Sequence, residues 1–447
     1  MKIFFAGIGG SGVSAIAGFA AGKGHKVSGS DRQFDKDPSN IIRIRLESAG
    51  IRIVPQDGSG LDETLDKAVF STAVEPSNPD LQMARALGIS VRTRPEHLAD
   101  IVSEYRTIAV AGTSGKSTTS GLLAFLMHRL EMSPNFIGGG RVKQFRTDSN
   151  PGNFLTGRSD HLVIEACESD GSIVNYRPAH SIIANLDIDH HSIGETAGMF
   201  EQLADNTSGL VIVNADDWNL KACRIDGAVS YSIETTSDYQ AVNIVYHPFE
   251  TSFEIYGQRF LLSMPGRHNL YNALACIALL AELGTLMSDI AAVLPGFSGI
   301  ERRFDIHLND GKHLVIDDYA HNPHKISSLI RTMQQIAGSV CYIFQPHGFG
   351  PTRMMKDGYI STFINGLRSS DSLVLLPIYY AGGTAAKDIS SEDLAVGIRE
   401  AGRNAIVIQD RNELLDRLPA ADAYVVLGAR DDSLSGLAAE IANRLKY

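Results

Sequence analysis

The chain has 447 residues, of which 44% are hydrophobic and 20% are charged, a composition typical of a globular protein and not of a disordered one. Its formal net charge of -11 argues against partners such as nucleic acid or an anionic membrane surface, because both favour a basic protein. The length predicts about three domains at roughly 150 residues each. Four widely spaced cysteines predict neither a disulfide framework nor a zinc site, and they fit a cytoplasmic location.

Short apolar runs alternate with longer amphipathic stretches along the whole chain. The first run, KIFFAGI, is interpreted as a strand and not as a signal peptide, because glycine interrupts it and no A-x-A site follows. The alternation predicts an α/β fold with parallel sheets covered on both faces. It falls into three groups, which predict domains at residues 1–104, 105–298 and 299–447, and the segment AVNIVYHPFETSFEIYGQRFLLS predicts a small antiparallel insertion in the second.

A glycine-rich turn follows the first strand. Gly7, Gly9 and Gly12 fit G-x-G-x-x-G at the head of a predicted helix, and Asp31 ends the next strand. Glycines let backbone N–H groups approach a diphosphate, and a helix N-terminus favours negative charge. The motif therefore predicts a nucleotide or nucleotide-sugar diphosphate site, with tight packing alone as the alternative, and it does not say which nucleotide.

A second glycine-rich turn, AVAGTSGKSTTSGLL, lies between a predicted strand and a predicted helix. It is a shortened P-loop, because the G-K-[ST] core is present but Val110 stands where the usual first glycine would be. Backbone amides and a lysine can surround phosphates there, and a serine hydroxyl can bind Mg²⁺. The candidate nucleoside-triphosphate residues are Gly112, Thr113, Ser114, Gly115, Lys116, Ser117 and Thr118.

Acidic residues and histidines follow the next two strands of the same group. HLVIEACESD ends with Glu165 and Glu168, and SIIANLDIDHHS carries His190 and its acidic neighbours. Because the carboxyl ends of parallel strands share one sheet edge, these groups are expected beside the P-loop, where Glu165 and His190 are the favoured metal ligands. Solvated or helix-capping acids are the alternative.

Nine segments then match a known family in order: GIGGSG, SGSD, FSTAV, GTSGKSTT, EACESD, NLDIDHH, GRHNLYNALA, GIERRFDI and DDYAHNP. On these motifs the chain resembles the Mur ligases over nearly its full length. The resemblance implies Rossmann-like first and third domains around an ATP-binding central domain. It also implies an ATP- and Mg²⁺-dependent enzyme, monomeric or homodimeric, that joins an amino acid to UDP-N-acetylmuramate or a related UDP-sugar through an acyl phosphate.

The resemblance assigns roles position by position. Lys116 would hold the β- and γ-phosphates, and Ser117, Glu165 and His190 would bind metal. The other residues implied for ATP are Asn269, Arg302 and Asp317. Those implied for the UDP-sugar are Gly9, Gly10, Ser11, Gly12, Asp31 and Ser71. The amino-acid site would carry Tyr319, His347 and Arg353, with His321 as a catalytic neighbour.

Three departures from the family pattern stand out. Ser114 replaces a histidine in the P-loop, and Cys167 replaces an aspartate in the acidic segment. In FQPHGFGPTR, a loop judged from its glycines and prolines, Gly348 and Pro351 replace the two arginines that alanine-adding members use for the amino-acid carboxylate. Because a forked guanidinium is hard to replace there, we expect either Arg353 or Arg430 to compensate, or the acceptor to differ from alanine.

Three alternatives stay open from the sequence. A related ligase could use another amino acid or a peptide, for example in recycling of wall precursors. A nucleotide-binding homologue could lack alanine ligase activity. A nicotinamide-dependent oxidoreductase built on GIGGSG would leave GTSGKSTT and RHNLYN unexplained.

Overall fold

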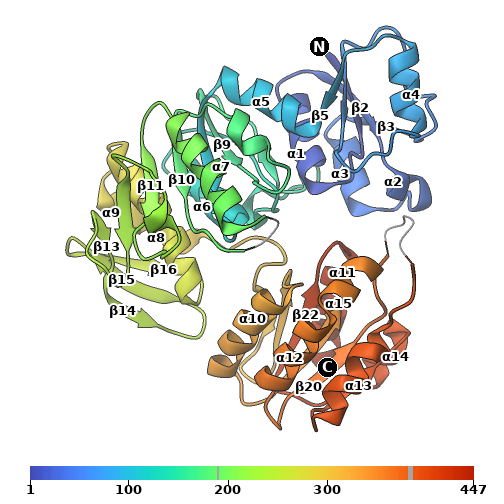
Figure 1. Ribbon diagram of the computed structural model, residues 1–447, viewed down its shortest axis with the longest axis vertical. Helices are drawn as coiled ribbons and strands as arrows, with labels where there is room; N and C mark the ends of the chain where they lie inside the picture. The colour runs from blue at the N-terminus through green and yellow to red at the C-terminus, as the bar shows by residue number, and fades with distance from the viewer. Residues whose placement is uncertain (189–190, 381–385, 447) are drawn as a thin grey trace. The chain divides into compact units, whose positions relative to one another are not determined.

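The computed structural model describes residues 1–188, 191–380 and 386–446 (Figure 1). The chain divides into two compact units, Met1–Ile300 and Glu301–Tyr447. The first unit contains both the first and the second predicted domain, and the three-domain boundaries stay a prediction. Among the described residues, no helix is long and apolar enough to cross a membrane.

The first sheet of unit 1 has five parallel strands in the order β3-β2-β1-β4-β5. The chain builds β2 and β3 on one side of β1 and then returns to build β4 and β5 on the other. The loop after β1 therefore lies where the strand order reverses, which is where α/β sheets bind ligands. The strands are β1 (Lys2–Ala6), β2 (Lys26–Ser30), β3 (Arg52–Val54), β4 (Lys67–Phe70) and β5 (Val91–Thr93), and the helices are α1 (Ser11–Gly22), α2 (Arg32–Lys36), α3 (Ile41–Ser48), α4 (Pro79–Ala86) and α5 (Arg94–Glu104).

The second sheet has eight strands in the order β13-β12-β11-β10-β6-β9-β7-β8, with β6 between β10 and β9. All neighbours are parallel except β7 and β8. The strands are β6 (Arg106–Ala111), β7 (Asn135–Ile137), β8 (Phe154–Leu155), β9 (His161–Glu165), β10 (His180–Ile183), β11 (Val211–Asn214), β12 (Val229–Ser232) and β13 (Tyr239–Gln240), and the helices are α6 (Lys116–Arg129), α7 (Ile193–Asp205), α8 (Arg267–Glu282) and α9 (Met287–Val293). Four single 3₁₀ turns are η1 (Lys143–Phe145), η2 (Ser172–Asn175), η3 (Leu220–Ala222) and η4 (Leu294–Gly296).

The antiparallel insertion is present as predicted. Strands β14 (Val242–Tyr246), β15 (Thr251–Ile255) and β16 (Gln258–Leu262) form a separate antiparallel sheet. Its inner residues Phe253 and Phe260 stack with ring centroids 5.3 Å apart and join the core that also buries α6 and α8. Because α6 and α8 are enclosed by this core, most of their residues are buried, including polar residues of their first turns.

Unit 2 holds one sheet in the order β17-β18-β22-β19-β20-β21, parallel except for β17. Successive side chains of β19 point to opposite faces of the sheet. Cys341 and Ile343 join the core under α15, whereas Phe344 contacts Tyr359 and Phe363 of α12 on the other face. The strands are β17 (Asp305–Asn309), β18 (Leu314–Asp318), β19 (Val340–Gln345), β20 (Ser372–Leu375), β21 (Ala405–Val407) and β22 (Ala423–Gly428), and the helices are α10 (Pro323–Ile336), α11 (Phe349–Met354), α12 (Lys356–Gly366), α13 (Ser391–Glu400), α14 (Arg411–Asp416) and α15 (Ser433–Leu445).

The stretch FQPHGFGPTR, residues 344–353, is only partly a loop: its first two residues end β19 and its last five lie in α11, so its interpretation as a loop was wrong over these seven residues. The chain leaves β19, turns at Gly348 with φ 69° and enters the short helix α11. Pro351 is tolerated there because it lies in the first turn, where no intrahelical partner for its missing N–H is needed. The predicted α/β class with parallel sheets is confirmed.

Within unit 1, helix α1 packs closely against the edge of the second sheet. A Cβ added at Gly18 would lie 2.2 Å from the ring of Phe154, and Asn153 donates hydrogen bonds to Ser11 O at 2.7 Å and to Ser14 Oγ at 2.9 Å. The two sheets consequently share one hydrophobic core.

We expect Gly18→Ala to lower the free energy of unfolding by about 1–3 kcal/mol, because the new methyl group must displace a buried ring. Gly198→Ala in α7 is the matched control, since nothing lies within 4 Å of its added Cβ, and it should stabilise the chain by about 0.5–1 kcal/mol through helix propensity alone. Denaturant unfolding followed by circular dichroism measures both. A Gly18→Ala protein as stable as the wild type would contradict the close packing.

Candidate active site

The P-loop of unit 1 connects β6 to α6 and depends on glycine at a close approach. Gly115 has φ 80°, and an added Cβ would lie 2.5 Å from Asn272 Oδ1 of α8. Any other residue would strain the backbone and displace Asn272. The loop therefore packs closely against the second turn of α8.

Asn185, the second residue after β10, holds the P-loop from the other side. Its Oδ1 accepts hydrogen bonds from Thr113 Oγ1 at 2.9 Å and from Ser114 N at 2.8 Å, and its Nδ2 donates to Ser114 O at 2.9 Å. Asn185 is not among the residues that the sequence motifs predict. The signal was its place at the end of the strand SIIANL, next to the acids and histidines that were considered.

Lys116 begins α6 and makes a buried ion pair. Its Nζ donates to Gly112 O at 2.6 Å and to Glu168 Oε2 at 2.8 Å, and the Lys116 and Glu168 side chains are 11% and 1% exposed. Burial lowers the pKa of Lys116, but Glu168, Cys167 and Glu165 together outweigh burial and raise it above its ordinary value. The lysine is therefore charged at neutral pH.

Glu168 has a second oxygen with no hydrogen-bond partner. Glu168 Oε1 is buried and unpaired among the described residues, so the carboxylate retains an acceptor beside Lys116.

Ser117 and Glu165 converge as the sequence predicted. Ser117 Oγ donates to Glu165 Oε1 at 3.1 Å, and Glu165 Oε2 accepts from Gly139 N at 2.9 Å. A hydroxyl and a carboxylate oxygen side by side are ligands that Mg²⁺ prefers. No group of three or more His, Cys, Asp or Glu that could hold a metal ion occurs in the part of the chain that the structure describes. The predicted ligand His190 lies outside the described residues.

Two further predicted residues line the start of the neighbouring helices. Thr118 is buried in the first turn of α6. Asn269, in the first turn of α8, donates from Nδ2 to Pro265 O at 2.8 Å and accepts at Oδ1 from Asn272 at 3.4 Å. Asn269 therefore contacts Asn272, the residue against which Gly115 packs. The role of Asn269 toward a nucleotide stays a prediction.

The first glycine loop lies between the carboxyl ends of β1 and β4. Gly9 N donates to Asp31 Oδ2 at 2.9 Å, and Asp31 Oδ1 also caps α2 by accepting from Gln33 N at 2.8 Å. Burial raises the pKa of Asp31 while these two backbone bonds lower it. The carboxylate that the sequence predicted as a ligand therefore also holds the loop in shape.

The remaining loop residues border the same edge. Gly10 precedes α1 as its N-cap and Ser11 begins the helix, while an added Cβ at Gly7 would lie 3.0 Å from Ser71 Cβ after β4. An added Cβ at Gly12 would meet Arg94 at 3.4 Å, and Arg94 forms a 2.6 Å ion pair with Asp170.

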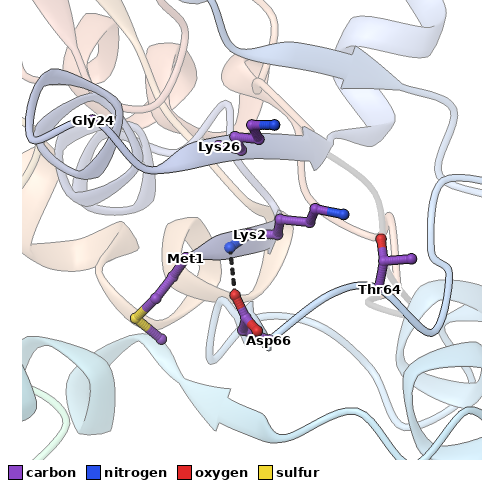
Figure 2. Close-up of a pocket in the computed structure, with 6 residues that line it drawn as sticks. All are labelled: Met1, Lys2, Gly24, Lys26, Thr64 and Asp66. Atoms are coloured by element: carbon purple, nitrogen blue, oxygen red, sulfur yellow. Dashed lines mark hydrogen bonds between the residues drawn. The ribbon is translucent and has the colours of Figure 1, made fainter.

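A shallow hollow at the opposite end of the first sheet is a different feature. Figure 2 shows it lined by Met1, Lys2, Gly24, Lys26, Thr64 and Asp66, with Lys2 N donating to Asp66 Oδ2 at 2.7 Å. Lys2 and Lys26 begin β1 and β2, so this hollow lies at the strand ends remote from Gly7 and Gly9.

In unit 2, Arg302 and Asp317 are turned toward each other. Arg302 is 4% exposed, and its Nε lies 3.2 Å from both carboxylate oxygens of the fully buried Asp317. Its other nitrogens donate to Gly428 O at 2.8 Å and to Asp431 O at 3.0 Å. Burial raises the pKa of Asp317, and the Arg302 guanidinium acts in the opposite direction.

The neighbouring Arg303 is the better-exposed cation of this segment. Its guanidinium lies over the Tyr319 ring, 4.8 Å from the centroid, and the side chain is partly accessible. Arg302 is the residue of the pair that the family resemblance implied for ATP, and its guanidinium is bonded to four protein oxygens. The two arginines lie in the turn before β17, where Arg302 has φ 60°, and the sequence does not say which of two adjacent turn residues is buried.

Tyr319, His321 and His347 gather at the carboxyl edge of β18 and β19. His321 Nδ1 donates to Tyr319 O at 2.8 Å, since a carbonyl oxygen can only accept, which leaves Nε2 as an acceptor. Burial and the charge of Lys325 lower the pKa of His321 to about 3, so its ring is neutral at pH 7. The rings of His321 and His347 lie 5.3 Å apart edge to face.

Arg353, on α11, is paired within the protein. Its Nη2 bonds Asp388 Oδ1 and donates to Ala386 O at 3.1 Å. Both side chains of the ion pair are about half exposed. Its predicted role in holding an amino-acid carboxylate therefore requires this pair to open.

Comparisons with known proteins agree with the arrangement. Three family models match consecutive parts of the chain: the Mur ligase family catalytic domain over residues 2–106, the Mur ligase middle domain over 110–280, and the Mur ligase glutamate ligase domain over 302–430. The resemblance inferred from the motifs is confirmed.

Individual relatives extend over nearly the full length. The UDP-N-acetylmuramate–L-alanine ligase of Dinoroseobacter shibae is 34% identical over 96% of this chain and 94% of that protein. The solved UDP-N-acetylmuramate-alanine ligase of Thermotoga maritima has a TM-score of 0.84 at 26% identity and covers 100% and 99% of the two chains. A murein peptide ligase of Psychrobacter arcticus, at 23% identity and TM-score 0.71 over 100% and 98%, shares the fold. The three family models together span most of the chain, which belongs to the Mur ligase family.

Proposed function

We propose that the protein is an ATP-dependent ligase that joins L-alanine to UDP-N-acetylmuramate through an acyl phosphate, a step of peptidoglycan precursor synthesis. The observation that carries the proposal is the P-loop with its buried, charged Lys116 beside the Ser117–Glu165 pair. The full-length relatives named as UDP-N-acetylmuramate–L-alanine ligases support the choice of substrates.

The chemistry requires two anions, a carboxylate and a triphosphate, to approach each other. In the proposal, the P-loop amides and Lys116 bind the β- and γ-phosphates and reduce this repulsion. Ser117 and Glu165 would hold Mg²⁺, with His190 as a further ligand, and the ion would neutralise phosphate charge. The substrate carboxylate attacks the γ-phosphorus, ADP leaves, and the amine then displaces phosphate from the acyl carbon.

Other residues take supporting roles in the proposal. The loop from Gly9 to Gly12, with Ser71 beside it, would bind the diphosphate of the UDP-sugar. Asn269 would contact the nucleotide from α8. Neutral His321 offers Nε2 as an acceptor to the ammonium group of the incoming amino acid. We further propose a cytoplasmic enzyme, monomeric or homodimeric.

The main alternative is a sibling ligase with another amino acid or a peptide as acceptor. The altered stretch at Gly348 and Pro351 favours it, because the amino-acid side of the site is where this chain departs from the family pattern. A homologue that binds nucleotide without alanine ligase activity is the second alternative.

The decisive assay is phosphate release from ATP with UDP-N-acetylmuramate, screened over single amino acids and short peptides. We expect release that depends on both UDP-N-acetylmuramate and L-alanine. Release with another amino acid or a peptide would support the sibling ligase, and no release with any acceptor would refute ligase activity.

The buried ion pair gives a prediction that separates folding from catalysis. Lys116→Met should lower the free energy of unfolding by about 3–5 kcal/mol, because it leaves Glu168 as an unpaired buried carboxylate. Lys116→Met/Glu168→Met should recover most of that loss, because removing both charges leaves no desolvated ion.

Both variants should lose ATP-dependent turnover and bind ADP more weakly in calorimetry, although the double variant is folded. Chemical denaturation gives the stabilities. Equal stability of the single and double variants would show that the pair is not buried as described, and turnover by the double variant would remove Lys116 from the mechanism.

A further inference from the structure

Arg430 follows β22, the strand that lies between β18 and β19 in the sheet of unit 2. The register pairs Leu427 with Asp318 and Gly428 with Gln345. The chain after β22 therefore emerges at the same sheet edge as the residues after β18 and β19, which include His321 and His347.

The backbone at Arg430 is in a conformation that glycine would adopt more easily. Its φ is 64°, in the left-handed region that disfavours residues with a Cβ. Buried Arg302 holds it there, because its guanidinium donates to the carbonyls of Gly428 and Asp431, which flank Arg430 on both sides. Strain kept in place by its surroundings is characteristic of functional positions.

The acidic residue next to Arg430 in the chain is already paired with another arginine. Asp431 is paired with Arg411 at 2.6 Å, and its other oxygen accepts from Ser433. Arg430 is exposed and makes no hydrogen bond or ion pair with the residues that the structure describes. The competing cation Arg353 is bound to Asp388.

His347 completes the arrangement. Its Nδ1 is buried without a hydrogen-bond partner among the described residues. Burial lowers the pKa of His347, and the positive charge of Arg430 lowers it further. A cation and an unsatisfied ring nitrogen thus face the same edge.

We infer that Arg430, assisted by His347, binds the α-carboxylate of the incoming amino acid. The inference rests on the proposed function and deepens it, because it names the anchor for the acceptor. A forked guanidinium matches a carboxylate in geometry and charge, and the carboxylate would give His347 Nδ1–H an acceptor. Arg430 would thereby replace the cations that Gly348 and Pro351 lack.

The test uses the full chain with Arg430→Gly, a substitution that suits the left-handed backbone and should not unfold the protein. We expect the KM for L-alanine to rise roughly 10- to 150-fold, the range for losing hydrogen bonds to a charged group. The acyl phosphate step should keep its rate, measured as hydroxamate formed from ATP, UDP-N-acetylmuramate and hydroxylamine without amino acid.

A second readout isolates the carboxylate. The wild type should prefer L-alanine to L-alaninamide, and Arg430→Gly should lose most of this preference, whereas a merely structural role would weaken both acceptors alike. Arg430→Lys should recover only part of it, because the fork is lost. Arg399→Ala is the charge control, since Arg399 lies near the end of α13 and pairs with Glu392.

The outcomes are distinct. An unchanged KM and preference in Arg430→Gly, or their loss in Arg353→Ala instead, would overturn the assignment while hydroxamate formation upholds the ligase. Absence of hydroxamate from the wild type would overturn the proposed function and the assignment together.

Discussion

The ion pair between Lys116 and Glu168 is the interaction on which the nucleotide side of unit 1 depends. A lysine desolvated at the start of α6 needs a counter-charge, and Glu168 supplies it from the loop after β9. The sheet register brings the two loops together, because Val110 of β6 lies opposite Glu165 of β9. The same register places Glu165 beside Ser117. The pairing of β6 with β9 therefore positions both Lys116 with its counter-charge and the Ser117 and Glu165 oxygens that are suited to Mg²⁺.

Unit 2 uses a buried cation for a different purpose. Arg302 ties Asp317 of β18 to the backbone beyond β22, and its bonds end on the carbonyls of Gly428 and Asp431. Glycine is needed at position 428, where β22 ends beside β19, since an added Cβ would lie 2.7 Å from Gln345 O and the φ is 149°. The Arg302 guanidinium thus maintains the backbone conformation of the segment that carries Arg430.

The P-loop, the α/β class and the antiparallel insertion could be predicted because each is written in local pattern: glycine spacing, short apolar runs and the loss of helical interleaving. The pairing of Ser117 with Glu165 followed from the rule that parallel strands end at one edge. Asn185 was missed and the role of Glu168 was left undecided because their partners, the P-loop and Lys116, are distant in sequence. Helix α11 was missed because Gly348, Gly350 and Pro351 obscure a single helical turn.

By itself, the sequence determined the alternation of strands and helices along the chain, the glycines that phosphate loops require and the family to which the chain belongs, because these depend on residue type at fixed spacing. Only the tertiary structure decided which of Arg302 and Arg303 is buried, that Asp31 supports its glycine loop, and that Arg353 is paired while Arg430 has no partner in the described part of the chain. The reason is physical: a charged side chain is available to a substrate only when no residue distant in sequence has already neutralised it.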